Sequence, residues 1–153
     1  MKLYFVRHTT AADYSANDAQ RALTRQGEDE ARRVGITLAG VGAQPSRIFS
    51  SPMLRAHQTA GIIGRELKFA RPTETLEELT NGRTTPSLLR ALPVVGGEVV
   101  LVGHMPSLAE HLTEILGKPN SSEFAFGKGS VACIELESSG STGGKLLFFK
   151  HLT

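Results

Sequence analysis

Short apolar runs alternate with amphipathic stretches along this chain, and the alternation predicts strands followed by helices. Runs rich in β-branched and aromatic residues are typical of buried strands, and they occupy residues 3–6, 47–50, 98–103, 130–137 and 145–152. Apolar residues that recur every three or four positions indicate one face of a helix, and they occupy residues 24–38, 52–68, 85–92 and 106–116. We expect residues 71–83 to be irregular.

The order of these elements predicts the fold class. Strands that alternate with helices favour an α/β fold, here a three-layer α/β/α sandwich with a mostly parallel central sheet. The last two strands lack a helix between them, and their Ser- and Gly-rich connector, residues 138–144, suits a C-terminal hairpin. A length of 153 residues is enough for a real core, so we expect residues 1–153 to form a single domain.

Two helix starts can be read from the residue types. Thr24 is a good N-cap for the first helix. Ser51 followed by Pro52 predicts that the second helix has Ser51 as its cap and Pro52 in its first position. This start would place Arg55 in the first turn, beside amides that have no partner within the helix.

Composition excludes several classes of protein. The net charge is +2, from 17 basic and 15 acidic residues that are scattered, whereas nucleic-acid binding favours a clustered basic face. No apolar run reaches the length of a spanning helix or of a signal-peptide core, so we expect a cytoplasmic protein that binds no membrane. The single cysteine, Cys133, cannot form an intramolecular disulfide, and we interpret it as a small buried strand residue rather than a reactive thiol.

Basic residues follow three of the predicted strands. Arg7 and His8 end the first strand, Arg55 follows the second, and His104 ends the third. Ligands of open α/β sheets bind at the carboxyl ends of strands, so we expect these four side chains to meet there. Guanidinium groups clamp phosphoryl oxygens, and histidine can attack phosphorus as a nucleophile. The spacing of His, Cys and Asp residues favours no metal site, and we expect no cofactor.

Three motifs carry a family resemblance. The segments Phe5-Val-Arg-His-Thr9, Ser50-Ser-Pro-Met-Leu-Arg-Ala56 and Val102-Gly-His-Met-Pro106 resemble those of the phosphoglycerate mutase-like histidine phosphatase superfamily. The short length and Leu76-Glu-Glu-Leu-Thr80 resemble its small bacterial branch, the phosphohistidine phosphatases of the SixA type. Leu23-Thr-x-x-Gly27 extends the similarity, which spans nearly the whole chain.

The resemblance implies a role for each matching residue. His8 would be the nucleophile, and Arg7, Arg55 and His104 would complete the phosphate pocket. The acid that protonates the leaving group would be Glu78, with Glu77 as the second candidate.

Two further residues are candidates for substrate binding. Thr9 stands where the family usually has a glycine, which allows unusual backbone angles, so loop conformation and pocket access are in question. Arg21 could border the pocket, and a solvated loop charge is the alternative interpretation.

Three functions are compatible with these residues. The first is a metal-independent phosphatase that dephosphorylates phosphohistidine in proteins, such as histidine-containing phosphotransfer domains, through a phosphohistidine intermediate on His8. The second is a phosphatase of small phosphate monoesters, which would need a working acid at Glu78 or Glu77. The third is a non-catalytic phosphate-binding module on the same fold. The chain lacks the long insertions that form lids in sugar-phosphate relatives, which favours a phosphorylated protein as the partner.

Overall fold

One mixed sheet runs through the molecule. A computed structural model describes residues 1–93, 97–137 and 143–152 of the chain. The strand order is β3-β2-β4-β1-β5-β6. The strands are β1 (Lys2–Arg7), β2 (Arg47–Ser50), β3 (Glu74–Thr75), β4 (Glu98–Gly103), β5 (Val131–Leu136) and β6 (Gly144–Lys150). The first four in that order are parallel, β5 is antiparallel to β1 and β6 is antiparallel to β5, which confirms the mostly parallel sheet and the C-terminal hairpin. Residues 138–142 of the predicted connector lie outside the described residues.

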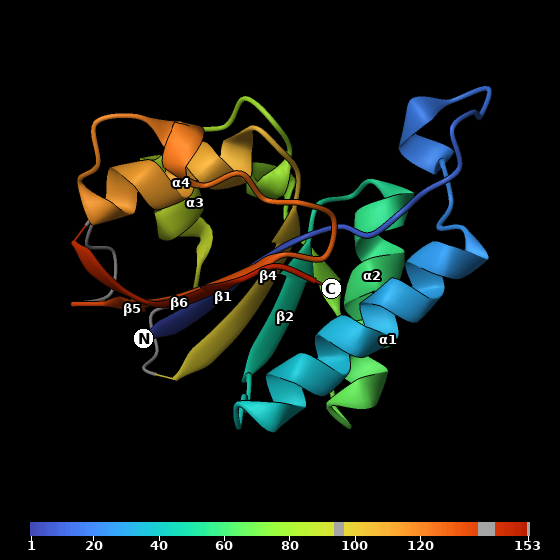
Figure 1. Cartoon of the computed structure of the whole chain (residues 1–153), viewed down its shortest axis with the longest axis horizontal. Coiled ribbons are helices and arrows are strands. Elements are labelled where there is room, and N and C mark those ends of the chain that lie inside the picture. Colours follow the sequence, from blue (N-terminus) through green and yellow to red (C-terminus); the bar gives the residue numbers. More distant parts are fainter. Residues whose placement is uncertain (94–96, 138–142, 153) are drawn as a thin grey trace.

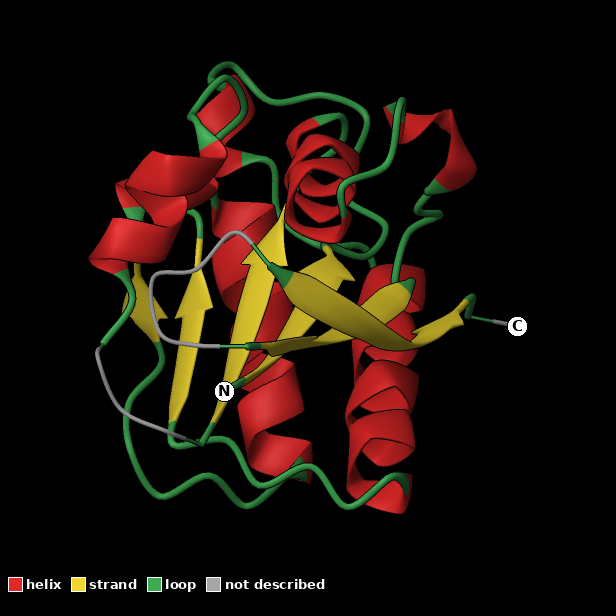
Figure 2. Ribbon diagram, turned by 90° about the vertical axis from the view of Figure 1, so that its left-hand side faces the viewer, coloured by secondary structure: helices red, strands yellow, loops and turns green. Residues whose placement is uncertain are grey.

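Helices cover both faces of the sheet (Figures 1 and 2). The pair α1 (Arg25–Gly40) and α2 (Leu54–Glu66) packs on one face, and α3 (Thr85–Ala91) and α4 (Ser107–Leu116) pack on the other. Short 3-10 helices, η1 (Asp18–Gln20), η2 (Glu77–Leu79) and η3 (Ser121–Glu123), lie in the connections. Each face encloses its own apolar core, so the predicted three-layer sandwich is confirmed. Among the described helices, none combines the length and apolar character that crossing a bilayer requires.

The start of α1 confirms the predicted N-cap, Thr24, and shows why residue 27 is a glycine. Thr24 is the N-cap, and its side chain accepts a hydrogen bond from the Gly27 amide. A Cβ added at Gly27 would lie 1.9 Å from the carbonyl oxygen of Thr10. Only a glycine therefore allows the chain after β1 to lie directly on this helix.

Two predictions for the middle of the chain were wrong. The helix α2 begins at Leu54 and has Met53 as its N-cap, without a side-chain hydrogen bond. Ser51 lies too far before the helix to be its cap. Its hydroxyl lies 2.6 Å from His104 Nε2, a contact between distant segments that no local pattern reveals. The segment of residues 71–83 is also more ordered than expected, since it contains β3 and η2.

The register of the parallel strands aligns their carboxyl ends. Arg7 of β1 pairs with Gly103 of β4, and Ser50 of β2 pairs with Val102 of β4. The next residues of these three strands therefore leave the sheet side by side at one edge. This edge is where the candidate side chains gather.

Candidate active site

His8 occupies the centre of the edge. It follows β1 directly and is 7% exposed, and its amide donates to the Gly103 carbonyl at 3.1 Å. Its Nδ1 lies 2.8 Å from the carbonyl oxygen of Thr9. Because a carbonyl oxygen only accepts, Nδ1 carries the hydrogen of the neutral ring and Nε2 keeps its lone pair. Nε2 is therefore the atom that can attack phosphorus.

His104 faces His8 from the end of β4. The two ring centroids lie 5.0 Å apart, and the ring planes are inclined by 51°. Ser51 Oγ accepts a hydrogen bond from the Met53 amide at 3.3 Å, so its own hydrogen can be donated to His104 Nε2. Ser51 thus holds the orientation of His104.

Two guanidinium groups border the histidines. Arg7 Nη1 donates to the Phe126 carbonyl at 2.9 Å, and Arg55 Nη1 donates to the Asp18 carbonyl at 3.0 Å. The Nε of each arginine is buried and has no hydrogen-bond partner within the described part of the chain. A buried N–H group without an acceptor costs free energy, so both arginines keep donor capacity that an anion would satisfy.

Burial lowers the pKa of both histidines. The pKa of His8 falls to about 4, mainly because burial disfavours the charged ring; the hydrogen bond to the Thr9 carbonyl opposes this, and the charges of Arg55 and Arg7 add to it. The pKa of His104 falls to about 3, first through burial and then through His8 and the two arginines. Both rings are therefore neutral at neutral pH, which nucleophilic attack by His8 requires.

Thr9 supports the loop that carries His8 through contacts with the two helices packed behind it. Its hydroxyl donates to the Gly27 carbonyl at 2.7 Å, and its amide donates to Thr59 Oγ1 at 3.2 Å. Among the described non-glycine residues, only Lys68 has a positive φ, so Thr9 needs none of the angles reserved for glycine. The threonine is buried and fixes the loop after β1, with its hydroxyl directed at α1.

The carboxylate candidates lie on η2, which packs against the end of β4. Glu78 is half-buried there, whereas Glu77 is exposed and its carboxylate lies 4.0 Å from Arg83. Asn81 fixes this segment to the start of α4, because it donates to the Met105 carbonyl at 2.8 Å and accepts from the Ser107 amide at 3.2 Å. Of the two acids, Glu78 is the less exposed.

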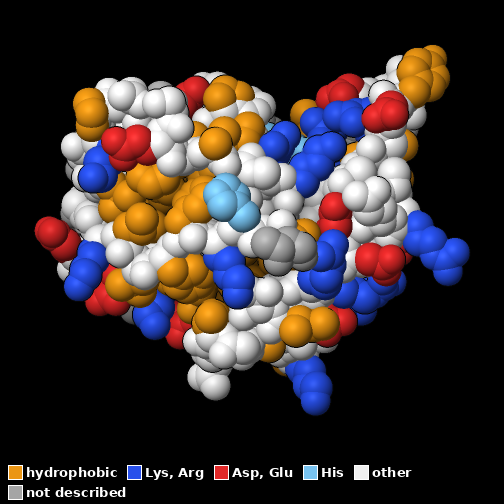
Figure 3. Space-filling model, in the orientation of Figure 1, with side chains coloured by type: hydrophobic (Ala, Val, Ile, Leu, Met, Phe, Trp, Pro, Cys, Tyr) orange, Lys and Arg blue, Asp and Glu red, His pale blue; other side chains and the backbone are white. Residues whose placement is uncertain are grey.

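Sequence reasoning missed three contributors. Ser51 was predicted to be a helix cap, and neither Asp18 nor Lys128 was predicted to take part, although Asp18 contacts Arg55 and the charge of Lys128 helps lower the pKa of His8. Each of them reaches the histidines or Arg55 across a long sequence separation, so only the fold reveals them. In Figure 3, Lys and Arg side chains gather around a notch between the protruding residues 11–23 and the body.

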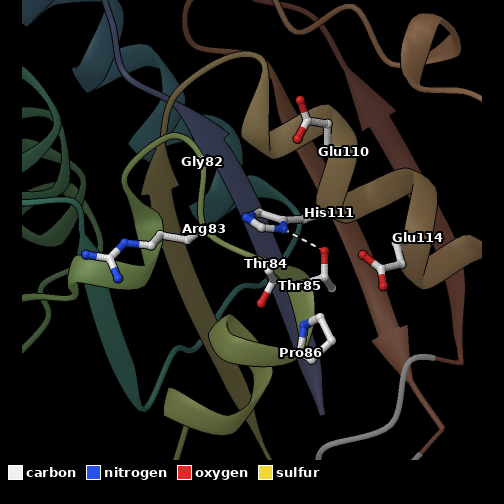
Figure 4. A pocket seen from close by; sticks show the side chains of 8 residues that line it. All are labelled: Gly82, Arg83, Thr84, Thr85, Pro86, Glu110, His111 and Glu114. Carbon is white, nitrogen blue, oxygen red and sulfur yellow. Dashed lines mark hydrogen bonds between the residues drawn. The ribbon is translucent and has the colours of Figure 1, made fainter.

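Other candidates lie outside this cluster. Cys133 is buried in β5 and burial raises its pKa to about 11, which agrees with a packing role. His111 lines a separate hollow of about 470 Å³ between α3 and α4 and is bonded there to Thr85 (Figure 4). Within the described ranges, no three His, Cys, Asp or Glu side chains are arranged to hold a metal ion.

Comparisons with known proteins identify a matching family and similar proteins. The family described as histidine phosphatase superfamily (branch 1) matches residues 3–86. The phosphohistidine phosphatase SixA of Escherichia coli K12 is 31% identical over 144 residues, which cover 92% of this chain and 88% of that protein.

Solved structures show the same architecture. A protein histidine phosphatase SixA complexed with tungstate superimposes with a TM-score of 0.86 and 30% identity, covering 99% of this chain and 97% of that one. A mycobacterial glucosyl-3-phosphoglycerate phosphatase, with a TM-score of 0.74, 17% identity and 98% coverage of both chains, shares the fold alone.

Proposed function

Because the chain belongs to the histidine phosphatase superfamily (branch 1), and is thus a phosphatase, we propose that it dephosphorylates phosphohistidine in a protein through His8. One observation carries this proposal: two neutral, buried imidazoles lie 5.0 Å apart between two guanidinium groups. The neutral rings supply a nucleophile, and the guanidiniums attract the anion that it attacks.

In the first step, Nε2 of His8 forms a bond to phosphorus while the bond from phosphorus to the substrate imidazole breaks. The phosphoryl oxygens carry negative charge throughout, and Arg7, Arg55 and His104 stabilise it. In the second step water attacks phosphorus, and inorganic phosphate and the free His8 are released. We propose that no metal is required because the guanidiniums already provide the positive charge.

The leaving group favours phosphohistidine over a phosphate ester. The bond broken and the bond formed in the first step are both between phosphorus and an imidazole nitrogen, so the transfer is nearly balanced in energy. The second ring nitrogen of phosphohistidine can take up a proton before the bond breaks, so the imidazole leaves as a neutral group, whereas a weakly basic ester oxygen must receive its proton from an acid as the bond breaks. Glu78 is the donor that we propose for this proton, with Glu77 second.

The partner that we propose is a phosphorylated cytoplasmic protein, such as a histidine-containing phosphotransfer domain. The similarity to phosphohistidine phosphatase SixA supports a phosphohistidine substrate. A phosphatase of small phosphate monoesters is the second candidate, and it requires a working acid at the half-buried Glu78 or at Glu77.

Phosphoryl trapping tests the nucleophile. The protein is incubated with labelled phosphoramidate and quenched, and the adduct is tested for acid lability and base stability, which are properties of phosphohistidine. We expect an adduct in the wild type and in His151→Ala, an exposed control, and none in His8→Ala. An adduct that persists in His8→Ala would reject His8 as the nucleophile, and a wild type that binds phosphate without turnover would favour the binding module.

Glu78→Gln separates the two substrate classes. If Glu78 is the acid, its loss should reduce hydrolysis of a phosphate ester by about 10²-fold and that of a phosphoramidate much less. Glu77→Gln is the matched control, and it should leave both rates nearly unchanged. Equal losses for both substrates would contradict the leaving-group argument.

A further inference from the structure

We infer that Asp18 is a positioning residue that holds the Arg55 guanidinium in the phosphate pocket, an inference that rests on the proposed function. Arg55 is 8% exposed. Its Nη1 donates to the Asp18 carbonyl at 3.0 Å, and its Nη2 lies 3.5 Å from Asp18 Oδ2. Both terminal nitrogens thus meet one residue, which comes from a segment that protrudes from the fold (Figure 1).

This segment, residues 11–23, is the arm, and its base is fixed to the helix that carries Arg55. The Ala12 amide donates to the Ala22 carbonyl at 2.8 Å, which closes the arm on itself. The Leu23 amide donates to Gln58 Oε1 on α2 at 2.8 Å. At the tip, the Asn17 side chain accepts from the Ala19 amide and caps η1, which includes Asp18. The position of Asp18 relative to α2 is therefore defined by the backbone.

Arg21 fixes the Asp18 side chain. Arg21 Nε lies 2.8 Å from Asp18 Oδ1, and Arg21 Nη1 donates to the Ala12 carbonyl at 2.9 Å. One carboxylate is thus shared by two guanidiniums, with Oδ1 on Arg21 and Oδ2 on Arg55. Arg21 therefore supports Asp18, and the Asp18 carboxylate in turn contacts Arg55.

Asp18 is not a proton donor for the substrate. Arg21 first, and then Arg55, lower the pKa of its carboxyl, so it is ionised at neutral pH. An anionic carboxylate neither donates a proton nor binds a phosphoryl oxygen. Its contact in the proposed pocket is with Arg55, and its charge also acts on His104, whose pKa it raises.

Positioning and simple electrostatics predict opposite outcomes when Asp18 is removed. A carboxylate beside an anion site repels the anion, so its loss would tighten binding if charge alone mattered. Loss of a contact that orients a clamping arginine weakens binding, because a guanidinium displaced by about 1 Å no longer matches the oxygens. The sign of the change in affinity therefore decides between the two.

Tungstate, a stand-in for the phosphoryl group, is the probe. Its Kd is measured by calorimetry for wild type, Asp18→Ala, Asp18→Asn and the control Asp13→Asn, which removes an exposed carboxylate from the same arm. We expect the Kd to rise about tenfold in Asp18→Ala, to rise less in Asp18→Asn, and to stay unchanged in Asp13→Asn. An unchanged or lower Kd in Asp18→Ala would overturn the inference.

A double-mutant cycle tests whether the effect passes through Arg55. Asp18→Ala should reduce kcat/KM for phosphoramidate about 10- to 100-fold in the wild type and hardly at all in an Arg55→Ala background. An equal loss in both backgrounds would overturn the inference. The proposed function fails separately: a wild type that turns over no phosphoramidate would reject it, while the tungstate Kd values would still decide the role of Asp18.

Discussion

Two buried histidines seven residues apart show what distinguishes the active site from ordinary packing. His104 precedes α4 and His111 lies within it, about two turns further along. They are 5% and 2% exposed, and each ring is bonded to a hydroxyl, Ser51 Oγ at 2.6 Å and Thr85 Oγ1 at 2.7 Å. Burial lowers the pKa of both. The two residues are alike in burial, in having a hydroxyl partner and in pKa direction, although His111 is bonded through Nδ1 and its buried Nε2 has no hydrogen-bond partner among the described residues.

Their charged surroundings differ. Arg55, Arg7 and the His8 ring act on His104, and all three disfavour its protonation. The neighbouring charge that acts on His111 is Glu114, which favours protonation, and Glu110 also lines its hollow (Figure 4). Cations gather where a phosphoryl group would bind, whereas two carboxylates, Glu110 and Glu114, line the hollow of His111 together with Arg83. A buried histidine with a lowered pKa therefore indicates a site only when the adjacent charges suit a ligand.

The largest expected difference is in kcat/KM, between variants in which His104 or His111 is replaced by leucine. We expect His104→Leu to reduce kcat/KM for phosphoramidate by about 10²- to 10³-fold, because a group that stabilises transition-state charge is lost. His111→Leu should leave kcat/KM within about twofold of the wild type. Steady-state kinetics of the two variants checks this, and a similar loss in both would mean that the comparison does not separate function from packing.

The pH dependence of activity should follow the low pKa of His8. A protonated His8 cannot attack, so kcat/KM should stay level from neutral pH down to about pH 5 and fall as the pH passes the His8 pKa of about 4. The measurement is a pH profile of kcat/KM, with the ionisation of the substrate titrated separately. A fall in kcat/KM that begins already near pH 6.5 would show that the environment of His8 does not lower its pKa.

Lys128→Gln tests the electrostatic contribution to the low pKa of His8. Its charge contributes to the low pKa of His8, though less than burial or the two arginines. Its removal should therefore shift the acid limb of the profile to higher pH by a few tenths of a unit. Lys118→Gln, which removes a cation from the loop after α4, is the control and should leave the profile in place.

The smallest effect concerns the stability of the His111 contact. His111→Leu leaves the buried Thr85 hydroxyl without its partner, so adding Thr85→Val should recover about 1 kcal/mol in the free energy of unfolding. Urea unfolding of the single and double variants measures this difference. If Thr85→Val gave no recovery, the hydrogen bond would not be the contribution of His111.

Local patterns were sufficient for much of this protein. Apolar runs and hydrophobic periodicity are local properties, so five of the six strands and the four α-helices found in the described residues could be predicted. Residues at the carboxyl ends of parallel strands lie along one edge of the sheet, so the sequence alone predicted that Arg7, His8 and His104 lie close together. The two-residue strand β3 was missed because so short a segment has no periodicity.

The tertiary structure decided which partner each polar side chain has. Ser51 looks like a helix cap in sequence, yet it bonds to His104, 53 residues away. Asp18 looks like a turn residue, yet it meets Arg55, 37 residues away. Such pairs depend on the strand register and on how an arm folds back over a helix, and both are set by the packing of the whole chain. The sequence by itself thus determined the candidate reacting groups, and the fold alone determined which side chains contact them and which charges surround them.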